Sequence, residues 1–449
     1  MRRMVAAALT DALVATTRFG FAPAPGQLET IANDPRGWVL QQLNAQPASL
    51  DPSLPSGAAM VAELLQMRQE AKQTKSDDSK KAENKRLRAI YLAEVEARNA
   101  AAITSDAPLL ERMTRFWSNH FTVSCVRPVI RGFAGAFERE AIRPHVTGRF
   151  VDMLFAAERH PAMLFYLDQV LSIGPNSQVG QRRRVGLNEN LAREMMELHT
   201  IGVDAGYTQA DVTSFARILT GWSIARLKAP DAGHFHFYPQ LHEPGAQTLL
   251  GKVYGEDGYD QGATALRDLA AHPATATHIA TKLARHFIAD DPPKDSIERI
   301  AAVFRDTGGD LKRVTAAVVR EDAAWKPFAK MRTPDELLVS TCRVTGFTPP
   351  APFQVQTLHT LDQQPFFAPQ PEGWSDQAKD WIGPESVLHR ADCCQSFAAR
   401  LPDPPDPVVL ADAIFGETLS DDTGQAIRRA ASRREGLALL IASPEFQRR

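Results

Sequence analysis

The stretch NENLAREMMELHTIG, residues 188 to 202, crowds acidic, basic and amide side chains onto one short predicted helix. At about 100° per residue, Asn190, Glu194 and Glu197 fall beside one another, and Arg193 lies one step further round. The packed face of this helix is the apolar stripe formed by Leu187, Leu191, Met195 and Leu198. Carboxylates that border a packed face either pin neighbouring helices through ion pairs or point into a polar pocket as metal ligands or acid–base groups. Both interpretations stay open for Glu194 and Glu197.

The stretch RFWSNHF, residues 115 to 121, places a histidine inside an apolar face. On a helix spanning 107–121, His120 falls in the middle of the face that Trp117 and Phe121 share. A buried imidazole needs a partner. Most are simply hydrogen-bonded core residues, but histidine is also the commonest metal ligand and a tunable general base. We expect the partner of His120 to be a carboxylate of the 187–199 helix.

Two further histidines extend the predicted site. His199 falls on the opposite flank of its stripe in ideal helical geometry, so it meets the glutamates only if the last turn before Gly202 deviates. His242 follows the period-two segment HFHFY, in which His234 and His236 share one face of an extended chain. Such spacing can present two nitrogens to one metal ion.

These residues predict one polar pocket assembled from three segments. Its predicted members are His120, Asn190, Glu194, Glu197, His199 and His242, with Trp117, Asn119 and Arg193 around them. The residues expected to act in acid–base catalysis are His120, Glu194 and Glu197. The residues expected to bind metal are His120, Glu194, His199 and His242. Histidine and carboxylate ligands without cysteine suit a divalent Zn, Mn or Fe ion.

Several well-known catalytic motifs are absent. None of the 12 histidines follows a glutamate by three positions, and no two histidines are four apart, which removes the di-iron bundle and His-Glu-x-x-His patterns. GAQTLLGKV (245–253) imitates a phosphate loop but is one residue too long and has Val253 where Ser or Thr is needed. The motifs therefore do not support a standard hydrolase, kinase or dehydrogenase function.

The composition is that of a water-soluble folded chain. The sequence has 449 residues, 44% of them hydrophobic and 23% charged, and a net charge of -2. This balance argues against nucleic acid or an anionic membrane as the partner. No apolar run reaches the roughly 18 to 20 residues that a spanning helix needs. The four cysteines have neither zinc nor disulfide spacing, so we expect free thiols.

Apolar spacings of three and four predict a mainly α-helical fold, a large bundle-like domain over 1–449 with long ordered loops and little β structure. Sub-lobes are expected at about 1–225, 226–345 and 346–449, and the polar segment 69–88 is expected to be a solvated helix or a disordered insertion. The predicted helices are 58–102, 107–121, 134–142, 187–201, 209–222, 262–271, 274–288, 294–305, 310–320, 334–344 and 423–433. The segments predicted to be ordered loops are 228–260 and 347–384. The N-terminal twenty residues predict a first helix rather than a signal peptide, and because a leader could have been removed, both a cytoplasmic and a periplasmic location stay open.

The chain resembles the bacterial family called domain of unknown function 1800. The stretches that carry the likeness are RFGFAPAPGQLE, RFWSNHFTVS, NENLAREMMELHTIGVDAGYTQADVTSFARILTGW, FHFYPQLHEPGAQTLLG, LAAHPATATHIATKLARHF and GWSDQAKDWIGPESVLHRADC. The family has no established activity, and its members are often exported and encoded beside an uncharacterised family related to sulfatases. The resemblance singles out Trp117, Asn119, His120, Asn188, Glu189, Asn190, Arg193, Glu194, Glu197, His199, His242, Gly245 and Gly251.

Three positions depart from the family pattern. The family often has histidine where Ser118 stands, aspartate where Glu243 stands and lysine where Gln247 stands. If Ser118 replaces a ligand, this member has a weakened or lost site.

Two functions follow as expectations. The first is a metal-dependent enzyme that acts on a small molecule or a polysaccharide-type substrate. The alternative is a non-catalytic helical scaffold or accessory protein for an exported partner, with a protein of the sulfatase-related family as the candidate partner. The scaffold predicts a large apolar surface patch and no enclosed polar cavity.

Overall fold

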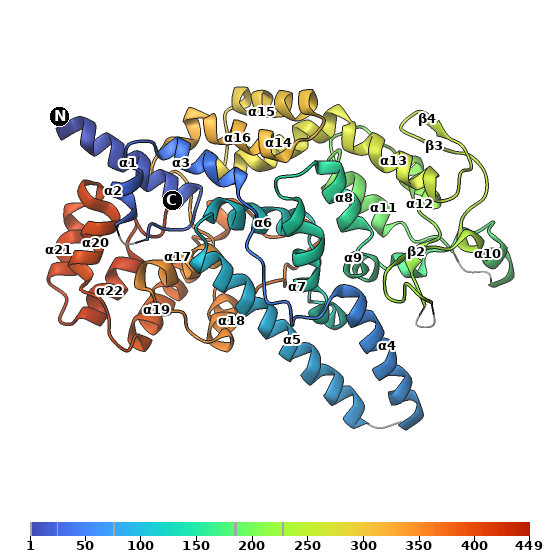
Figure 1. Cartoon of the computed structure of the whole chain (residues 1–449), viewed down its shortest axis with the longest axis horizontal. Helices are drawn as coiled ribbons and strands as arrows, with labels where there is room; N and C mark the ends of the chain where they lie inside the picture. The colour runs from blue at the N-terminus through green and yellow to red at the C-terminus, as the bar shows by residue number, and fades with distance from the viewer. Residues whose placement is uncertain (1, 25, 75–76, 184–185, 227–228) are drawn as a thin grey trace.

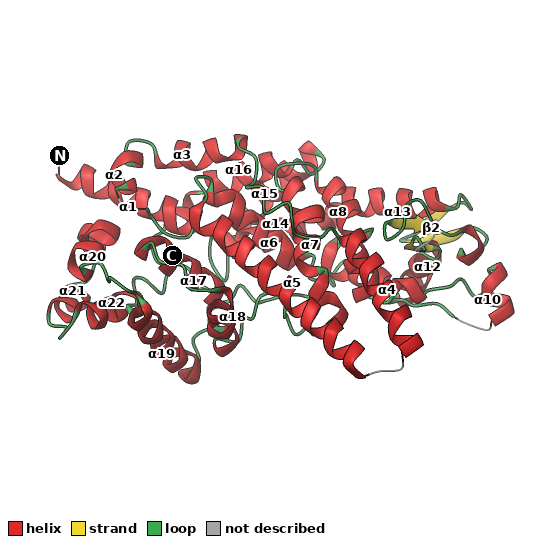
Figure 2. Ribbon diagram, turned by 60° about the horizontal axis from the view of Figure 1, so that its bottom comes forward, coloured by secondary structure: helices red, strands yellow, loops and turns green. Residues whose placement is uncertain are grey.

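The computed structural model of the chain describes residues 2–24, 26–74, 77–183, 186–226 and 229–449. The described chain is 63% helical and only 4% strand, which confirms the mainly α-helical prediction (Figure 2). Residues 75 and 76, inside the predicted helix 58–102, and residue 228, at the start of a predicted loop, lie outside the described residues.

The α-helices of the described chain are α1 (Arg2–Arg18), α2 (Gln27–Ile31), α3 (Pro35–Gln41), α4 (Gly57–Thr74), α5 (Asp77–Thr104), α6 (Pro108–His120), α7 (Ala134–Phe137), α8 (Phe150–Glu158), α9 (Pro161–Tyr166), α10 (Gln178–Arg183), α11 (Asn190–Glu194), α12 (Gln209–Ile218), α13 (Tyr259–Ala271), α14 (Pro273–Phe287), α15 (Lys294–Thr307), α16 (Leu311–Arg320), α17 (Pro334–Thr345), α18 (Ala351–Thr360), α19 (Pro384–Arg400), α20 (Pro407–Phe415), α21 (Asp421–Arg428) and α22 (Arg433–Ala442). Two single π-helical turns, Glu138–Ile142 and Met195–His199, continue α7 and α11. The strands are β1 (Trp222–Ile224), β2 (Phe235–Phe237), β3 (Gln247–Leu249) and β4 (Lys252–Tyr254), paired antiparallel as β1–β2 and β3–β4.

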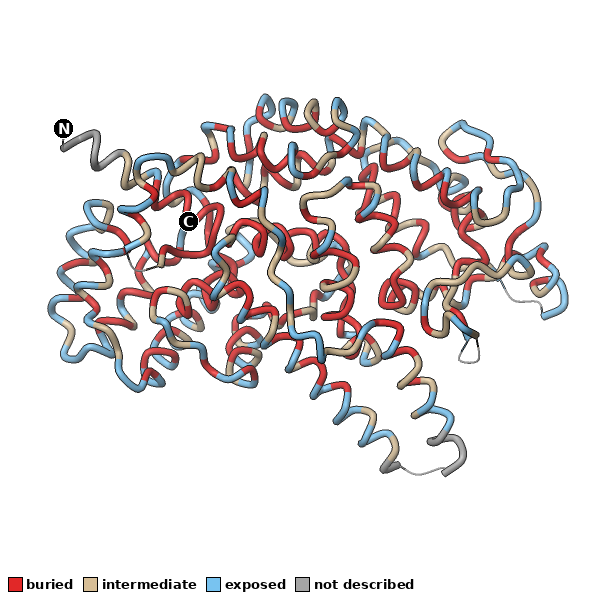
Figure 3. The backbone as a smooth tube through the Cα atoms, viewed as in Figure 1, coloured by how far each residue is buried: buried red, intermediate tan, exposed pale blue. Residues whose placement is uncertain are grey.

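Helix α6 lies in the middle of the molecule, and nearly all of its residues are buried. The buried backbone in Figure 3 runs through the interior from the N-terminal helices to the C-terminal ones. The main hydrophobic cluster likewise joins residues from Ala12 to Phe446. The α4–α5 hairpin projects away from this body (Figure 1), and the described residues 79–88 at its outer part are mostly exposed. How the chain divides into sub-lobes stays a prediction.

Helix boundaries follow local capping chemistry. Thr208 and Asp211 form the predicted capping box at the start of α12, each side chain accepting from the backbone of the other. Helix α6 begins at Pro108, whose missing N–H costs nothing in a first turn. No helix among the described residues is both long enough and apolar enough to cross a membrane.

The two predicted loops differ in outcome. Segment 228–260 contains β2, β3 and β4, and Phe235 and Phe237 of β2 both pack on Tyr259. Segment 347–384 was expected to lack helix, but α18 occupies Ala351–Thr360 within it. Its proline-rich beginning supplied the misleading signal, because Pro350 and its neighbours start this helix rather than prevent it.

Candidate active-site cavity

Helix α6 carries polar side chains on two of its faces. Arg112, Arg115 and Asn119 recur at helical spacing on one face. Trp117 and His120 lie on another, among the aromatic rings of the core. The first face borders a cavity, and the second meets the histidines predicted from the sequence.

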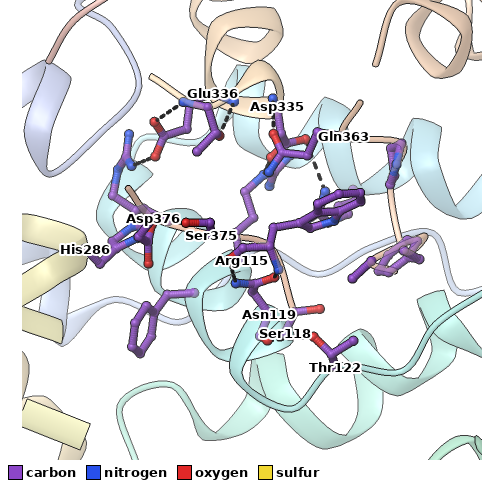
Figure 4. A pocket seen from close by; sticks show the side chains of 18 of the residues that line it. Arg115, Ser118, Asn119, Thr122, His286, Asp335, Glu336, Gln363, Ser375 and Asp376 are labelled. Carbon is purple, nitrogen blue, oxygen red and sulfur yellow. Dashed lines mark hydrogen bonds and ion pairs between the residues drawn. The ribbon is translucent and has the colours of Figure 1, made fainter. Parts of the chain in front are cut away.

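The cavity has a volume of about 90 Å³. One water molecule needs about 10–15 Å³ of such space, so the cavity can hold several waters or a small organic molecule. Its walls come from α5, α6, α14, the start of α17 and the loop before α19 (Figure 4). Its polar lining consists of Arg98, Arg112, Arg115, Ser118, Asn119, Thr122, His286, Thr333, Asp335, Glu336, Gln363, Ser375 and Asp376.

Arg115 is fixed by two partners and keeps one free nitrogen. Its Nε donates to Asp335 Oδ2 and its Nη2 donates to Asn99 Oδ1, each at 2.7 Å. Its Nη1 is buried and has no partner within the described part of the chain. Burial alone would raise the pKa of Asp335, but Arg115 and Arg98 hold it below its ordinary value. Asp335 also lies in the first turn of α17, where the helix dipole favours a negative charge.

Glu336, the next residue, lies between two buried guanidinium groups. It pairs with Arg112 and accepts from Arg449 Nε at 2.9 Å. Burial would raise the pKa of Glu336, but these two arginines hold it far below its ordinary value. Arg18 and Arg332 lie close enough to interact with the same group, and neither pairs with an Asp or Glu side chain in the described chain. Positive charge therefore exceeds negative charge on this side of the cavity, which favours an anionic ligand.

His286 and Asp376 form a buried pair on the cavity wall. His286 Nδ1 lies 2.7 Å from Asp376 Oδ1, and its Nε2 is buried with no partner in the described chain. Burial lowers the pKa of His286, with Asp376 opposing the shift. Burial would raise the pKa of Asp376, but His286, Lys330 and Arg449 hold it low. A neutral imidazole beside an ionised carboxylate carries its proton on Nδ1, so Nε2 is left as a base.

Asn119 holds the loop that carries Asp376. Its Nδ2 donates to the Trp374 carbonyl at 2.8 Å, and its Oδ1 accepts from the Trp374 N–H at 2.7 Å. Gly373, the residue before Trp374, has a φ of 84°, and a Cβ there would come within 2.4 Å of the Asn119 carbonyl oxygen. Only glycine therefore lets the loop approach α6 so closely.

The second face of α6 meets the end of the predicted charged helix. His120 Nε2 lies 3.2 Å from the His199 carbonyl oxygen, and His278 Nε2 lies 3.0 Å from the Leu198 carbonyl oxygen. Carbonyls only accept, so both rings carry their proton on Nε2. The expected carboxylate partner of His120 is thus wrong, because the end of the helix offers orphan carbonyls that the imidazoles satisfy. His120 Nδ1 is left buried without a partner in the described chain.

The last turn of this helix deviates from α-helical geometry, because Met195–His199 is π-helical. His199 Nδ1 lies 2.7 Å from Oε1 of Glu158, and the two side chains are 1% and 0% exposed. The other oxygen of Glu158, Oε2, is buried with no partner among the described residues. The carboxylate that meets His199 therefore comes from α8 rather than from its own helix.

The glutamates of the opening motif have different surroundings. Glu197 accepts from Arg193 at 3.1 Å and from the Tyr207 hydroxyl at 2.6 Å. Arg193 also lies 3.6 Å from Glu189, as the i,i+4 spacing indicates. Glu194 is half-buried and forms no hydrogen bond or ion pair within the described chain. Burial raises its pKa, with nearby His199 opposing the shift.

Two other predicted members have separate surroundings. Asn190 is exposed at the start of α11. His242 Nδ1 lies 2.9 Å from the Thr220 carbonyl oxygen, and the ring packs against Phe237. The structure thus brings His120 and His199 into contact, while His242 has its own partners in the β1–β2 region.

Lys282 lies between the two polar regions. It is on α14, one turn from His278 and one turn from His286, and it is half-buried. It forms no hydrogen bond or ion pair within the described chain. Burial lowers the pKa of Lys282 to about 8, although Asp376 and Glu372 oppose the shift.

The predicted metal site is not confirmed. Within the described ranges, no group of three or more His, Cys, Asp or Glu side chains is arranged to hold a metal ion. The cysteines are free thiols, as expected, and three of the four, Cys125, Cys342 and Cys394, are buried.

A family model described as "Protein of unknown function (DUF1800)" matches residues 14–448. The chain belongs to this family. No curated protein and no solved structure gives a match. The DUF1800 match spans both polar regions and the loop with Asp376, so the cavity lies wholly inside the part of the chain that matches.

Sequence reasoning missed the cavity residues Arg98, Arg112, Arg115, His286, Asp335, Glu336 and Asp376. Three of these residues lie in motifs that carry the family resemblance. Arg115 opens RFWSNHF, His286 is the last residue but one of LAAHPATATHIATKLARHF, and Asp376 lies in GWSDQ. No spacing rule connects these segments, because they are far apart in the chain and meet only in the folded protein.

Proposed function

We propose that this DUF1800 protein is an enzyme that moves a proton on a small anionic molecule bound in the cavity. The observation that best supports the proposal is the buried His286–Asp376 pair, whose free Nε2 belongs to a residue lining the same cavity as Arg115. Buried polar atoms are nearly always hydrogen-bonded. In this proposal, a molecule bound in the cavity is the partner of both His286 Nε2 and Arg115 Nη1.

Each residue has a defined role in this proposal. Asp376 fixes the Nδ1–H tautomer of His286, which leaves Nε2 free to remove a proton. The same carboxylate stabilises the imidazolium that results. Arg115 donates to the anionic group of the substrate, and the surrounding buried guanidinium groups favour its charge.

The test compares the consumption of small molecules by three proteins. A cell-derived metabolite extract is incubated with the wild-type protein, with His286→Gln and with Asp376→Asn, and the products are followed by mass spectrometry. We expect a compound that the wild type converts and that His286→Gln converts about 100-fold or more slowly. Asp376→Asn is expected to be slow as well.

The matched control is His359→Gln, which changes an exposed histidine on α18. Circular dichroism establishes that every variant is folded. Conversion at the wild-type rate by folded His286→Gln contradicts the proposal. So does a wild-type protein that neither converts nor retains any compound.

A metal-dependent reaction at His120 is the second candidate. The observation that favours it is a pair of orphan atoms, His120 Nδ1 and Glu158 Oε2, both buried without partners within the described chain. Both side chains contact His199: His120 through Nε2 and Glu158 through Oε1. Stoichiometric zinc, manganese or iron in protein purified without an affinity tag supports this candidate, and metal-free protein that still turns over a substrate contradicts it.

The scaffold alternative, with an exported protein of the sulfatase-related family as its partner, has weaker support. It predicts a large apolar patch, but the exposed large hydrophobic residues of the described chain come mostly from separate segments: Val126, Leu171, Val203, Val253, Ile382, Val387, Leu388, Val409 and Leu439. It also predicts no enclosed polar cavity. Co-purification of a partner, with no metabolite turned over, would favour this alternative.

A further inference from the structure

A second hollow, lined by residues of α8, α13 and α15, lies apart from the active-site cavity. It is an open cleft of about 730 Å³, and the two sites share no lining residue. Phe150, Phe155, Phe304 and Tyr259 form part of its walls. A cleft of this size can take up a small molecule larger than the active-site cavity can hold.

The charged lining of the cleft is mostly positive. Arg149, Arg159, Arg267 and Arg305 line it, and among the described residues Asp152 is the one acidic member of the lining. Arg305 is paired with Glu298 at 2.7 Å, but the other three arginines have no carboxylate partner in the described chain. Neighbouring like charges without counter-charges repel one another, so the cleft favours a negatively charged occupant.

Two of these arginines are held against one ring. The guanidinium carbon of Arg159 lies 5.1 Å from the centroid of Phe155, and that of Arg267 lies 5.5 Å from the same centroid. Stacking of this kind uses the flat face of a guanidinium and leaves its in-plane N–H groups available. Arg159 donates from Nε to the Phe155 carbonyl and from Nη1 to the Tyr259 hydroxyl, each at 3.1 Å. The side chain of Arg267 makes no hydrogen bond within the described chain, so all of its guanidinium N–H groups are available.

Arg149, the residue just before α8, is positioned by backbone contacts. Its Nη2 donates to the Gly308 carbonyl at 3.2 Å, and its backbone forms an isolated bridge with Asp310. Gly308 has a φ of 60°, and a Cβ there would come within 2.7 Å of Arg149 Nη2. The three unpaired guanidinium groups are therefore held by packing and backbone contacts rather than by carboxylates.

We propose that this cleft is a binding site for a compact polyanion, a small molecule that carries two or more phosphate, sulfate or carboxylate groups. Guanidinium forks match the geometry of these oxyanions and bind them through paired N–H donors. The size of the cleft and the chain's net charge of -2 favour a small molecule over nucleic acid, which needs an extended basic surface. The site is independent of the reaction proposed for the cavity.

Isothermal titration calorimetry with tripolyphosphate and, in parallel, with citrate tests the proposal on the full chain. We expect binding of at least one probe at about 0.15 M ionic strength, where bare surface attraction is largely screened. Tighter binding of tripolyphosphate indicates a phosphate ligand, and tighter binding of citrate indicates a carboxylate ligand. Arg267→Gln and Arg159→Gln are each expected to weaken binding about tenfold or more, because each removes charged hydrogen-bond donors.

One control variant makes the test specific. Arg433→Gln changes an exposed arginine on α22, at the far end of the molecule from the cleft (Figure 1), and is expected to bind like the wild type. The proposal is overturned if neither probe binds, if Arg433→Gln weakens binding as much as Arg267→Gln, or if Arg267→Gln and Arg159→Gln both bind like the wild type.

Discussion

Replacement of Glu336 by glutamine should destabilise the protein strongly. Glu336 is the carboxylate that Arg112 and Arg449 share, and its side chain is only 5% exposed. Glutamine keeps the shape and can still accept from the Thr333 N–H at the start of α17, a bond that Glu336 Oε2 makes at 3.1 Å. The variant therefore removes the charge while keeping the helix cap.

The size of the stability loss follows from the buried charges that the substitution leaves unpaired. Loss of one partner of a buried ion pair costs about 3 to 5 kcal/mol, because the other charge is left buried and unpaired. Here two guanidinium groups lose their counter-charge. Their neighbours Arg18 and Arg332 add repulsion, since neither has an Asp or Glu side chain as a partner in the described chain. We expect Glu336→Gln to lower the free energy of unfolding by an amount in that range.

Urea unfolding at neutral pH, followed by circular dichroism, measures the loss. The matched control is Glu435→Gln at the exposed start of α22, where Glu435 accepts from the Ala431 N–H at 2.7 Å. That substitution removes a favourable charge near a helix N-terminus and should cost less than about 1 kcal/mol. Equal losses for the two variants would refute the argument that Glu336 neutralises a buried arginine cluster.

The same carboxylate predicts a pH dependence. The folded-state pKa of Glu336 is far below the unfolded value of about 4.3. As the pH falls below that value, the unfolded chain binds the proton first, so the stabilisation from Glu336 is present above about pH 4.3 and is lost in more acidic solution. The difference in stability between wild type and Glu336→Gln should therefore shrink as the pH falls below about 4. A difference that stays constant down to acidic pH contradicts this reasoning.

Three further predictions concern the surroundings of the cavity. Because burial lowers the pKa of Lys282 to about 8, its acylation rate, followed by peptide mass spectrometry, should reach half of its maximum near pH 8 rather than near the ordinary lysine value of about 10.4. Gly373→Ala should lower the melting temperature more than Gly245→Ala, because both have positive φ but only Gly373 faces Asn119 where a Cβ would go. Glu194→Gln should melt at or above the wild-type temperature, because burial already disfavours the charged form of Glu194. A lower melting temperature would mean that the Glu194 carboxylate forms a structural ion pair. A folded variant that loses bound metal would mean that this carboxylate is a metal ligand.

Local spacing in the sequence was enough to predict most helices and several contacts. The capping box of Thr208 and Asp211, the position of His120 on the aromatic face of α6 and the pairing of Arg193 with Glu197 all depend on residues within one helix or turn. Such contacts are fixed by the helical period, which the sequence displays directly. Helix α18 was missed because a proline-rich stretch has the same composition whether it begins a helix or forms a loop.

The tertiary structure alone decided which charges become buried and what they meet. From its own helix alone, Arg115 would be predicted to be an exposed charge in contact with solvent. His286 and Asp376, which form a pair, are 90 positions apart in the chain. A buried guanidinium or imidazole is tolerated only where other segments supply its acceptors, and here those acceptors come from α5, α17 and the loop after Gly373. The partner of His199 came from α8 for the same reason. The sequence by itself determined the helices that carry these groups, and only the packing of distant segments determined the polar sites that they form.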